Sequence, residues 1–87
     1  MRLSYLGELV PDMKSWGTLI SGYQFVIAYD ERLKAYSATW KNVKALHGPA
    51  QFIGDKIHPE AKLPYFDSMI AAERACDDTL KQLRNKN

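Results

Sequence analysis

The sequence predicts an α+β domain: a small antiparallel sheet built on a central β-hairpin, with a C-terminal amphipathic helix packed across one face. Three observations carry this prediction. Residues 23–29 and 34–41 alternate as strands do, the polar turn DERL joins them, and a stripe of apolar residues at helical spacing follows near the C-terminus. A chain of 87 residues has the length of one domain, so we assign residues 1–87 to a single domain.

The N-terminal third has the weakest pattern. RLSYLGELV alternates weakly and fits a short strand, while Pro11-Asp12 indicates a turn or the first turn of a short helix. Apolar residues at helical spacing follow at Met13, Trp16, Leu19 and Ile20. Because Gly17 disfavours a helix, both a strand and a helix stay open for this part of the chain.

The central hairpin has the strongest β signal. GYQFVIAY sets Tyr23, Phe25, Ile27 and Tyr29 against smaller or polar residues, and aromatic and β-branched side chains favour a pleated surface. The return arm KAYSATWK places Tyr36, Ala38 and Trp40 on one face. We expect that face to be buried beneath the helix and the other face to stay in contact with water.

Residues 48–66 show no sustained period and hold three of the four prolines. A structureless segment of this length is uncommon within a compact domain and is usually functional or disordered. Its apolar residues recur at intervals, which indicates a segment anchored to the core. Two interpretations stay open: a protein-binding loop, or a strand at Gln51–Ile53 that completes the sheet, and both can hold together.

The C-terminal segment FDSMIAAERACDDTLKQLRNK predicts one amphipathic helix. Its apolar stripe consists of Met69, Ala72, Cys76, Leu80 and Leu83. We predict Asp67 as the N-cap, because its carboxylate would accept amide hydrogens of the first turn. Cys76 is the single cysteine, so we expect a buried, unreactive thiol and no internal disulfide.

The composition restricts the setting and the partners. A single cysteine favours a reducing, cytoplasmic compartment. The longest apolar run, Phe25–Tyr29, is too short to cross a bilayer, so no membrane partner is expected. Net charge is +2, but residues 32–62 hold six cationic and two acidic residues and form a basic segment of net charge +4.

Catalytic and metal-binding patterns are weak. The serines lie in no nucleophile motif, and the sequence holds no phosphate-binding glycine loop. His47 and His58 with a neighbouring carboxylate match no known ligand spacing, so we predict no metal, no cofactor and no enzymatic activity.

Nucleic-acid binding is the alternative function that the basic Arg32–Lys62 segment suggests. Its candidate residues are Lys34, Tyr36, Trp40, Lys41 and Lys44, where lysines would contact phosphates and exposed aromatic rings would stack on bases. The alternation argues against this function, because Tyr36 and Trp40 share the face that is expected to be buried.

We expect a non-enzymatic protein-binding module. The candidate partner-binding residues in the tip of the anchored segment and beside it are Lys56, His58, Glu60, Lys62 and Tyr65. A homodimer through a strand edge or the helix face is a second expectation, because a small core gains from burying more surface. In size and architecture alone the chain is similar to phage and mobile-element inhibitors of host defence, including anti-CRISPR proteins, which implies a host protein as the partner.

Overall fold

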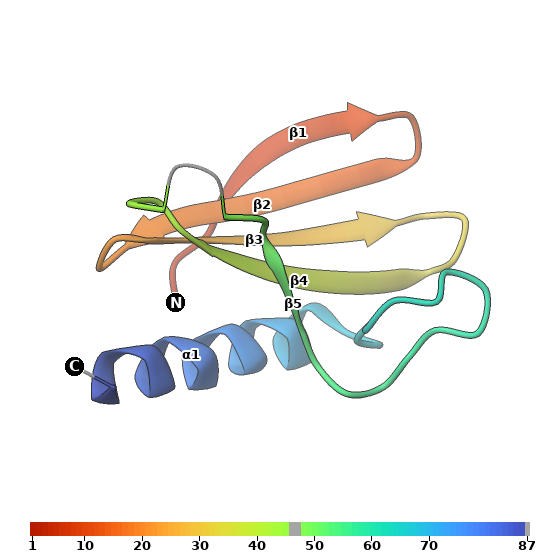
Figure 1. Ribbon diagram of the computed structural model, residues 1–87. Coiled ribbons are helices and arrows are strands. Elements are labelled where there is room, and N and C mark those ends of the chain that lie inside the picture. Colours follow the sequence, from red (N-terminus) through yellow and green to blue (C-terminus); the bar gives the residue numbers. More distant parts are fainter. Residues whose placement is uncertain (46–47, 87) are drawn as a thin grey trace.

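The computed structural model describes residues 1–45 and 48–86 and confirms the α+β class (Figure 1). Five strands form one antiparallel sheet in the order β1-β2-β3-β4-β5, and the helix α1 lies across one face. The elements are β1 (Ser4–Val10), β2 (Met13–Ile20), β3 (Tyr23–Asp30), β4 (Ala35–Asn42), β5 (Gln51–Ile53) and α1 (Met69–Asn85). Each strand therefore pairs with its neighbours in the sequence, and only α1 crosses the sheet.

The turns between the long strands have the backbone shapes that their residues favour. Pro11-Asp12 joins β1 to β2 with a positive φ of 68° at Asp12. Ser21 and Gly22 join β2 to β3, with φ of 55° and 82°. Two positive φ angles in a two-residue turn match the right-handed twist of a hairpin. A four-residue turn joins β3 to β4 as predicted, but it consists of residues 31–34 and not of the whole of DERL, because Asp30 still pairs with Ala35 as the last residue of β3.

Residues 13–20 are a strand, so the helical alternative for this part is wrong. Every residue of β2 from Met13 to Ile20 has a partner in β3. The apolar positions of this segment fit a helix as well as a strand, but the long neighbouring strand offers a complete ladder of backbone hydrogen bonds. The N-terminal strand expected within RLSYLGELV is present as β1.

The edge strand β1 bends over the sheet. Register shifts interrupt its pairing with β2 between Tyr5 and Gly7 and again between Glu8 and Val10, and Gly7 has a φ of 94°. Such bulges bend a strand and protect a sheet edge from pairing with other chains. The bend brings Leu6 over Gly17, where an added Cβ would lie 2.9 Å from Leu6 Cδ1.

The core lies between the helix and the sheet. Strand residues Phe25, Ile27 and Ala38 are fully buried there. The predicted helical stripe is confirmed, because α1 buries Ala72, Cys76 and Leu80 and packs Met69 and Leu83 beside them. The predicted burial of the Tyr36–Ala38–Trp40 face is confirmed as well, with both rings packed against this core.

The helix begins one residue later than predicted. Ser68, not Asp67, is the N-cap, and its Oγ accepts a hydrogen bond of 3.1 Å from the amide of Ala71. Serine and aspartate cap equally well, so burial of the stripe decides where the helix starts. Asp67 lies outside the helix and forms an ion pair of 2.9 Å with Lys56.

Residues 48–66 contain the strand that the sequence left open. Residues Gln51–Ile53 form β5, which pairs with Ala38–Trp40 of β4. The chain then leaves the sheet and returns at Phe66, whose amide and carbonyl both bond to Tyr36 at 2.7 and 3.0 Å. This return places residues 54–66 at the end of the sheet where the turn between β3 and β4 lies (Figure 1).

Candidate functional site

The sheet has a second face, opposite the helix, which we call the open face. Strand alternation and the observed register define four cross-strand rows on β2, β3 and β4. The rows are Met13–Asp30–Ala35, Ser15–Ala28–Ser37, Gly17–Val26–Thr39 and Leu19–Gln24–Lys41. Phe52 of β5 extends the third row, because it pairs with Thr39.

Large apolar side chains are exposed on the open face. Leu19 is 66% exposed, Leu6 52% and Phe52 44%. Val26, between them, is only half-buried. Single exposed apolar residues are ordinary on a protein surface, whereas several large ones on one face make that face a candidate interaction surface.

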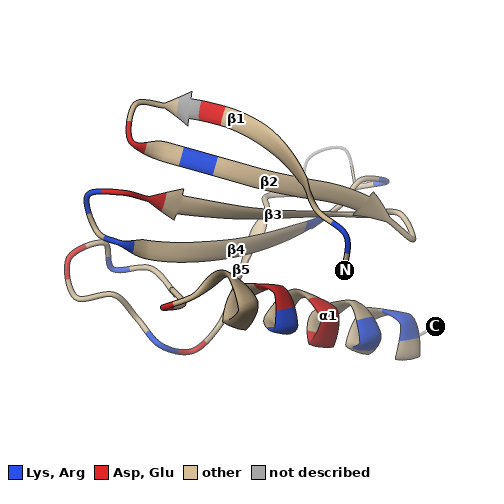
Figure 2. Cartoon of the chain, turned by 180° about the vertical axis from the view of Figure 1, so that it is seen from behind, with Lys and Arg blue, Asp and Glu red and all other residues tan. Residues whose placement is uncertain are grey.

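Charges are absent from the middle of this face. Figure 2 shows Lys, Arg, Asp and Glu in the turns, at the strand ends, in the loop and along α1, whereas the middle of β3 and β4 carries none. The two central rows contain only glycine, alanine, serine, threonine and valine. Depletion of charge at the centre of a patch, with charge at its rim, is the composition of a protein interface.

Residues 56–65 form a small hairpin that borders one end of the open face. Tyr65 donates its amide hydrogen to the Lys56 carbonyl, and His58 donates to the Leu63 carbonyl, both at 2.9 Å. Lys62 donates to the His58 carbonyl at 2.9 Å and has a φ of 60°, which closes the tip. The segment is therefore ordered by its own backbone hydrogen bonds, and we call it the loop hairpin.

His58 caps the tip of the loop hairpin. Its Nδ1 accepts hydrogen bonds from the amides of Glu60 at 3.1 Å and Ala61 at 3.3 Å. An imidazole nitrogen that accepts a hydrogen bond carries no proton, so the proton of the neutral ring lies on Nε2. The side chain thus holds the backbone of the turn in the way that an aspartate or serine caps a helix.

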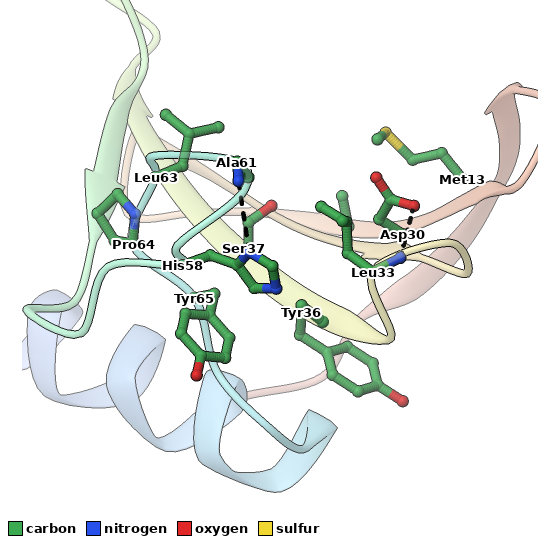
Figure 3. A pocket seen from close by; sticks show the side chains of 12 residues that line it. Met13, Asp30, Leu33, Tyr36, Ser37, His58, Ala61, Leu63, Pro64 and Tyr65 are labelled. Carbon is green, nitrogen blue, oxygen red and sulfur yellow. Dashed lines mark hydrogen bonds between the residues drawn. The ribbon is translucent and has the colours of Figure 1, made fainter.

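A small pocket lies between the loop hairpin and the open face (Figure 3). His58, Ala61 and Leu63 form one wall, and Met13, Asp30 and Leu33 form the other. Its volume is about 80 Å³. Sites for small molecules and cofactors have volumes of roughly 300–1,000 Å³. The pocket is therefore suited to one inserted side chain.

Asp30 is the acidic group at this pocket. Burial acts to raise the pKa of Asp30, but amide hydrogen bonds from Arg32 at 2.9 Å and Leu33 at 3.4 Å, together with the Arg32 guanidinium, outweigh it and lower that pKa overall. Asp30 is therefore ionised at neutral pH, and its charge lies at one end of the open face.

The structure brings together three of the five predicted partner-binding residues. Lys56 Nζ lies 4.9 Å from the centre of the Tyr65 ring, and the His58 ring contacts the same ring edge-on at 4.9 Å. The hydrogen bond to Asp67 raises the pKa of Lys56. Glu60 and Lys62 bond to His58 only through their backbone amides, and both residues are exposed at the tip of the loop hairpin. His58 and Tyr65 also line the pocket.

The residues of the nucleic-acid alternative are spread over two ends and two faces. Tyr36 and Trp40 pack against the core beneath α1. Lys34 precedes β4, whereas Lys41 and Lys44 lie at its far end, a separation of roughly 20 Å along a strand at 3.3 Å per residue. Rings that are partly buried against the core are poor stacking platforms for bases, and the lysines do not gather around one groove.

The remaining candidates concern the cysteine and the metal. Cys76 is fully buried, as predicted, and burial raises the pKa of its thiol to about 12. His47 lies outside the described residues. Within residues 1–45 and 48–86, no three His, Cys, Asp or Glu side chains lie close enough to hold a metal ion.

The sequence analysis does not identify the residues that make the open face a candidate site. Leu6, Leu19 and Phe52 were not among the candidates, and neither were the pocket residues of β2 and β3. One signal was present: once residues 13–20 are taken as a strand, alternation places Leu19 and Met13 on the same face. This alternation is not apparent while a helix remains an alternative for residues 13–20.

Comparison with known protein families, with curated proteins and with solved structures finds no match to this chain. In the part of the chain that the structure describes, no helix has the length and apolarity needed to span a membrane.

Proposed function

We propose that this protein is a non-enzymatic protein-binding module whose binding surface is the open face together with the loop hairpin. The observation that carries this proposal is the exposure of Leu6, Leu19 and Phe52 on the open face, whose two central rows on β2, β3 and β4 hold no charged residue. A cytoplasmic setting and the kinship in size and architecture with inhibitors of host proteins stay predictions.

The pocket adds specificity to this surface. A side chain of the partner that enters between Leu33 and Leu63 would leave water and contact apolar walls. Anchors of this kind, buried in a pocket at the centre of an interface, supply most of the affinity. The loop hairpin is held by its own hydrogen bonds, so little ordering is required when the partner binds.

The proposal is tested by capture with matched surface variants. The immobilised full chain is incubated with lysate of the cells that encode it, with and without nuclease, as wild type and as Leu19→Lys, Phe52→Lys and Ile70→Lys. Ile70 is a fitting control, because it is 62% exposed but lies on the helix, away from the open face. We expect one stoichiometric protein to bind wild type and Ile70→Lys, and to be lost from both open-face variants.

Two outcomes contradict the proposal. A partner that binds all four proteins equally would show that the open face is not the binding surface. Binding that disappears with nuclease and falls steeply with salt would instead favour nucleic acid and the Lys34–Lys44 segment.

A further inference from the structure

The pocket beside the loop hairpin combines apolar walls with a single carboxylate. Leu33, Ala61 and Leu63 supply apolar walls, and Ser37 of β4 lines the side formed by the sheet. Among the described residues that line the pocket, Asp30 is the only aspartate, glutamate, lysine or arginine. Such a pocket suits a side chain that is apolar along its length and cationic at its end.

One oxygen of the Asp30 carboxylate remains available to a partner. Oδ1 accepts the amide hydrogens of Arg32 at 2.9 Å and Leu33 at 3.4 Å. In Figure 3 the dashed line from the Leu33 amide ends on one carboxylate oxygen, and the other oxygen points away. This second oxygen, Oδ2, lies 3.5 Å from the guanidinium of Arg32, whose side chain is 73% exposed. Because an exposed pair of this kind is weak, Oδ2 can accept a stronger donor.

A second carboxylate lies beside the mouth of the pocket. A shallower depression adjoins the pocket, shares Asp30, Leu33 and Ala61 with it, and is also lined by Arg32 and Glu60. Glu60 is exposed and forms no ion pair with another residue that the structure describes. Two carboxylates against one guanidinium leave a net negative charge around the mouth. This charge attracts a cationic group and repels an anionic one.

The hydrogen bonds of Asp30 favour lysine over arginine as the cationic side chain. A guanidinium binds a carboxylate best through two parallel hydrogen bonds, one to each oxygen. Oδ1 of Asp30 already accepts two amide hydrogens, so this arrangement is blocked. A lysine ammonium is compact and needs only one oxygen at a time. The Ser37 hydroxyl, which also lines the pocket, offers it a second acceptor.

We propose that the pocket binds a lysine side chain of the partner protein, with its methylene groups against Leu33 and Leu63 and its ammonium hydrogen-bonded to Asp30 Oδ2. This inference rests on the proposed function, because it names the side chain through which the partner enters the pocket. Glu60 attracts the ammonium toward the mouth. The Arg32 guanidinium competes for the same carboxylate oxygen.

The test is a titration of the full chain with a lysine probe, followed by nuclear magnetic resonance. The probe is N-acetyl-lysine methylamide, and the readout is the amide shifts of Ala28, Ser37 and Ala61, which line the pocket. Two matched probes replace lysine by norleucine, which lacks the ammonium, and by arginine. We expect the lysine probe to bind about tenfold more tightly than the norleucine probe and more tightly than the arginine probe.

Three variants separate the pocket from the general charge of the surface. Asp30→Asn retains an oxygen for both amide hydrogen bonds and should weaken binding of the lysine probe about tenfold. Glu31→Gln is the matched control and should change nothing, because Glu31 pairs with Lys14 and does not line the pocket. Arg32→Gln should strengthen binding, because it removes the competing cation. Binding of the norleucine probe should be equal in all four proteins.

Several results would overturn this inference. They are pocket amides that do not respond to the lysine probe, a norleucine or arginine probe that binds as tightly, and an Asp30→Asn variant with wild-type affinity. If Asp30→Asn does not fold, as judged by circular dichroism, the three probes and Arg32→Gln still decide the question. In the capture experiment, a partner that binds Asp30→Asn as well as wild type but is lost from Phe52→Lys would contradict the lysine and support the proposed function.

Discussion

The two faces of the sheet come from the same strands and differ in almost everything else. The covered face carries Phe25, Ile27 and Ala38, all fully buried against α1. The open face carries the residues in between, such as Val26 and Ala28, which are half-buried although no helix covers them. Because successive residues of a strand point to opposite faces, the same stretch of sequence supplies both the covered face, which packs in the core, and the open face. The open face has no helix over it and exposes Leu19 and Phe52.

The first way to sharpen this comparison is to truncate neighbouring residues that point to opposite faces. Phe25→Ala should lower the free energy of unfolding by about 3–5 kcal/mol, because it leaves a cavity beneath the helix. Val26→Ala should lower it by less than about 1.5 kcal/mol, since that side chain already contacts water. Urea denaturation of both variants measures the difference. Equal losses would mean that the open face contributes to the core as much as the covered face does.

The second test compares thiols on the two faces. Native Cys76 should react with iodoacetamide only as fast as the protein unfolds, because its thiol is buried and its pKa is raised to about 12. A cysteine introduced by Val26→Cys in a Cys76→Ala background should react rapidly in the folded protein. Mass spectrometry of timed samples follows both reactions. Rapid labelling of Cys76 under native conditions would contradict the buried core.

The same thiol predicts a dependence of stability on pH. The folded pKa lies above the ordinary value of 9.0, so the folded state holds its proton more tightly than the unfolded state. The contribution of the Cys76 thiol to the free energy of unfolding is fully present below pH 9.0 and is lost as the pH rises toward about 12. Cys76→Ala should lose less stability than wild type over this range in urea denaturation. If the free energy of unfolding falls equally with pH in wild type and Cys76→Ala, the thiol does not cause the pH dependence.

A smaller effect is expected at the loop hairpin, which borders the open face. His58→Ala removes the acceptor for the amides of Glu60 and Ala61 and should cost about 1 kcal/mol of local stability. His58→Asn, whose side-chain oxygen can accept the same bonds, should retain most of it. Amide hydrogen exchange at these two residues is the measurement. Unchanged protection in His58→Ala would show that the cap is dispensable.

The smallest expected effect on folding concerns the exposed lysines. Lys56→Glu and Lys62→Glu should leave the midpoint of thermal unfolding nearly unchanged, because exposed ion pairs contribute little to stability. If the loop hairpin contacts the partner, the same reversals should weaken capture in the binding assay. Reversals that change neither stability nor capture would limit the binding surface to the open face.

The sequence is sufficient to predict those secondary-structure elements whose apolar pattern fits either a strand or a helix, but not both. The alternation of Tyr23–Tyr29 and the helical stripe through Cys76 each match a single period, and both predictions are confirmed. Residues 13–20 fit two periods, and only the pairing of β2 with β3 decides between them. The pocket could not be predicted from the sequence for a related reason. It joins Met13, Asp30 and His58, which the register and the loop hairpin bring together.

The order of elements along the chain has a consequence for biosynthesis. All five strands precede α1, and each pairs with the strand before it, so the sheet can begin to assemble as a nascent chain emerges from the ribosome. The residues of α1 that cover Phe25 and Ala38 are translated after all five strands. Until they emerge, the apolar face that α1 covers in the folded protein is exposed to solvent. The chain is therefore more prone to aggregation between the emergence of β5 and that of α1.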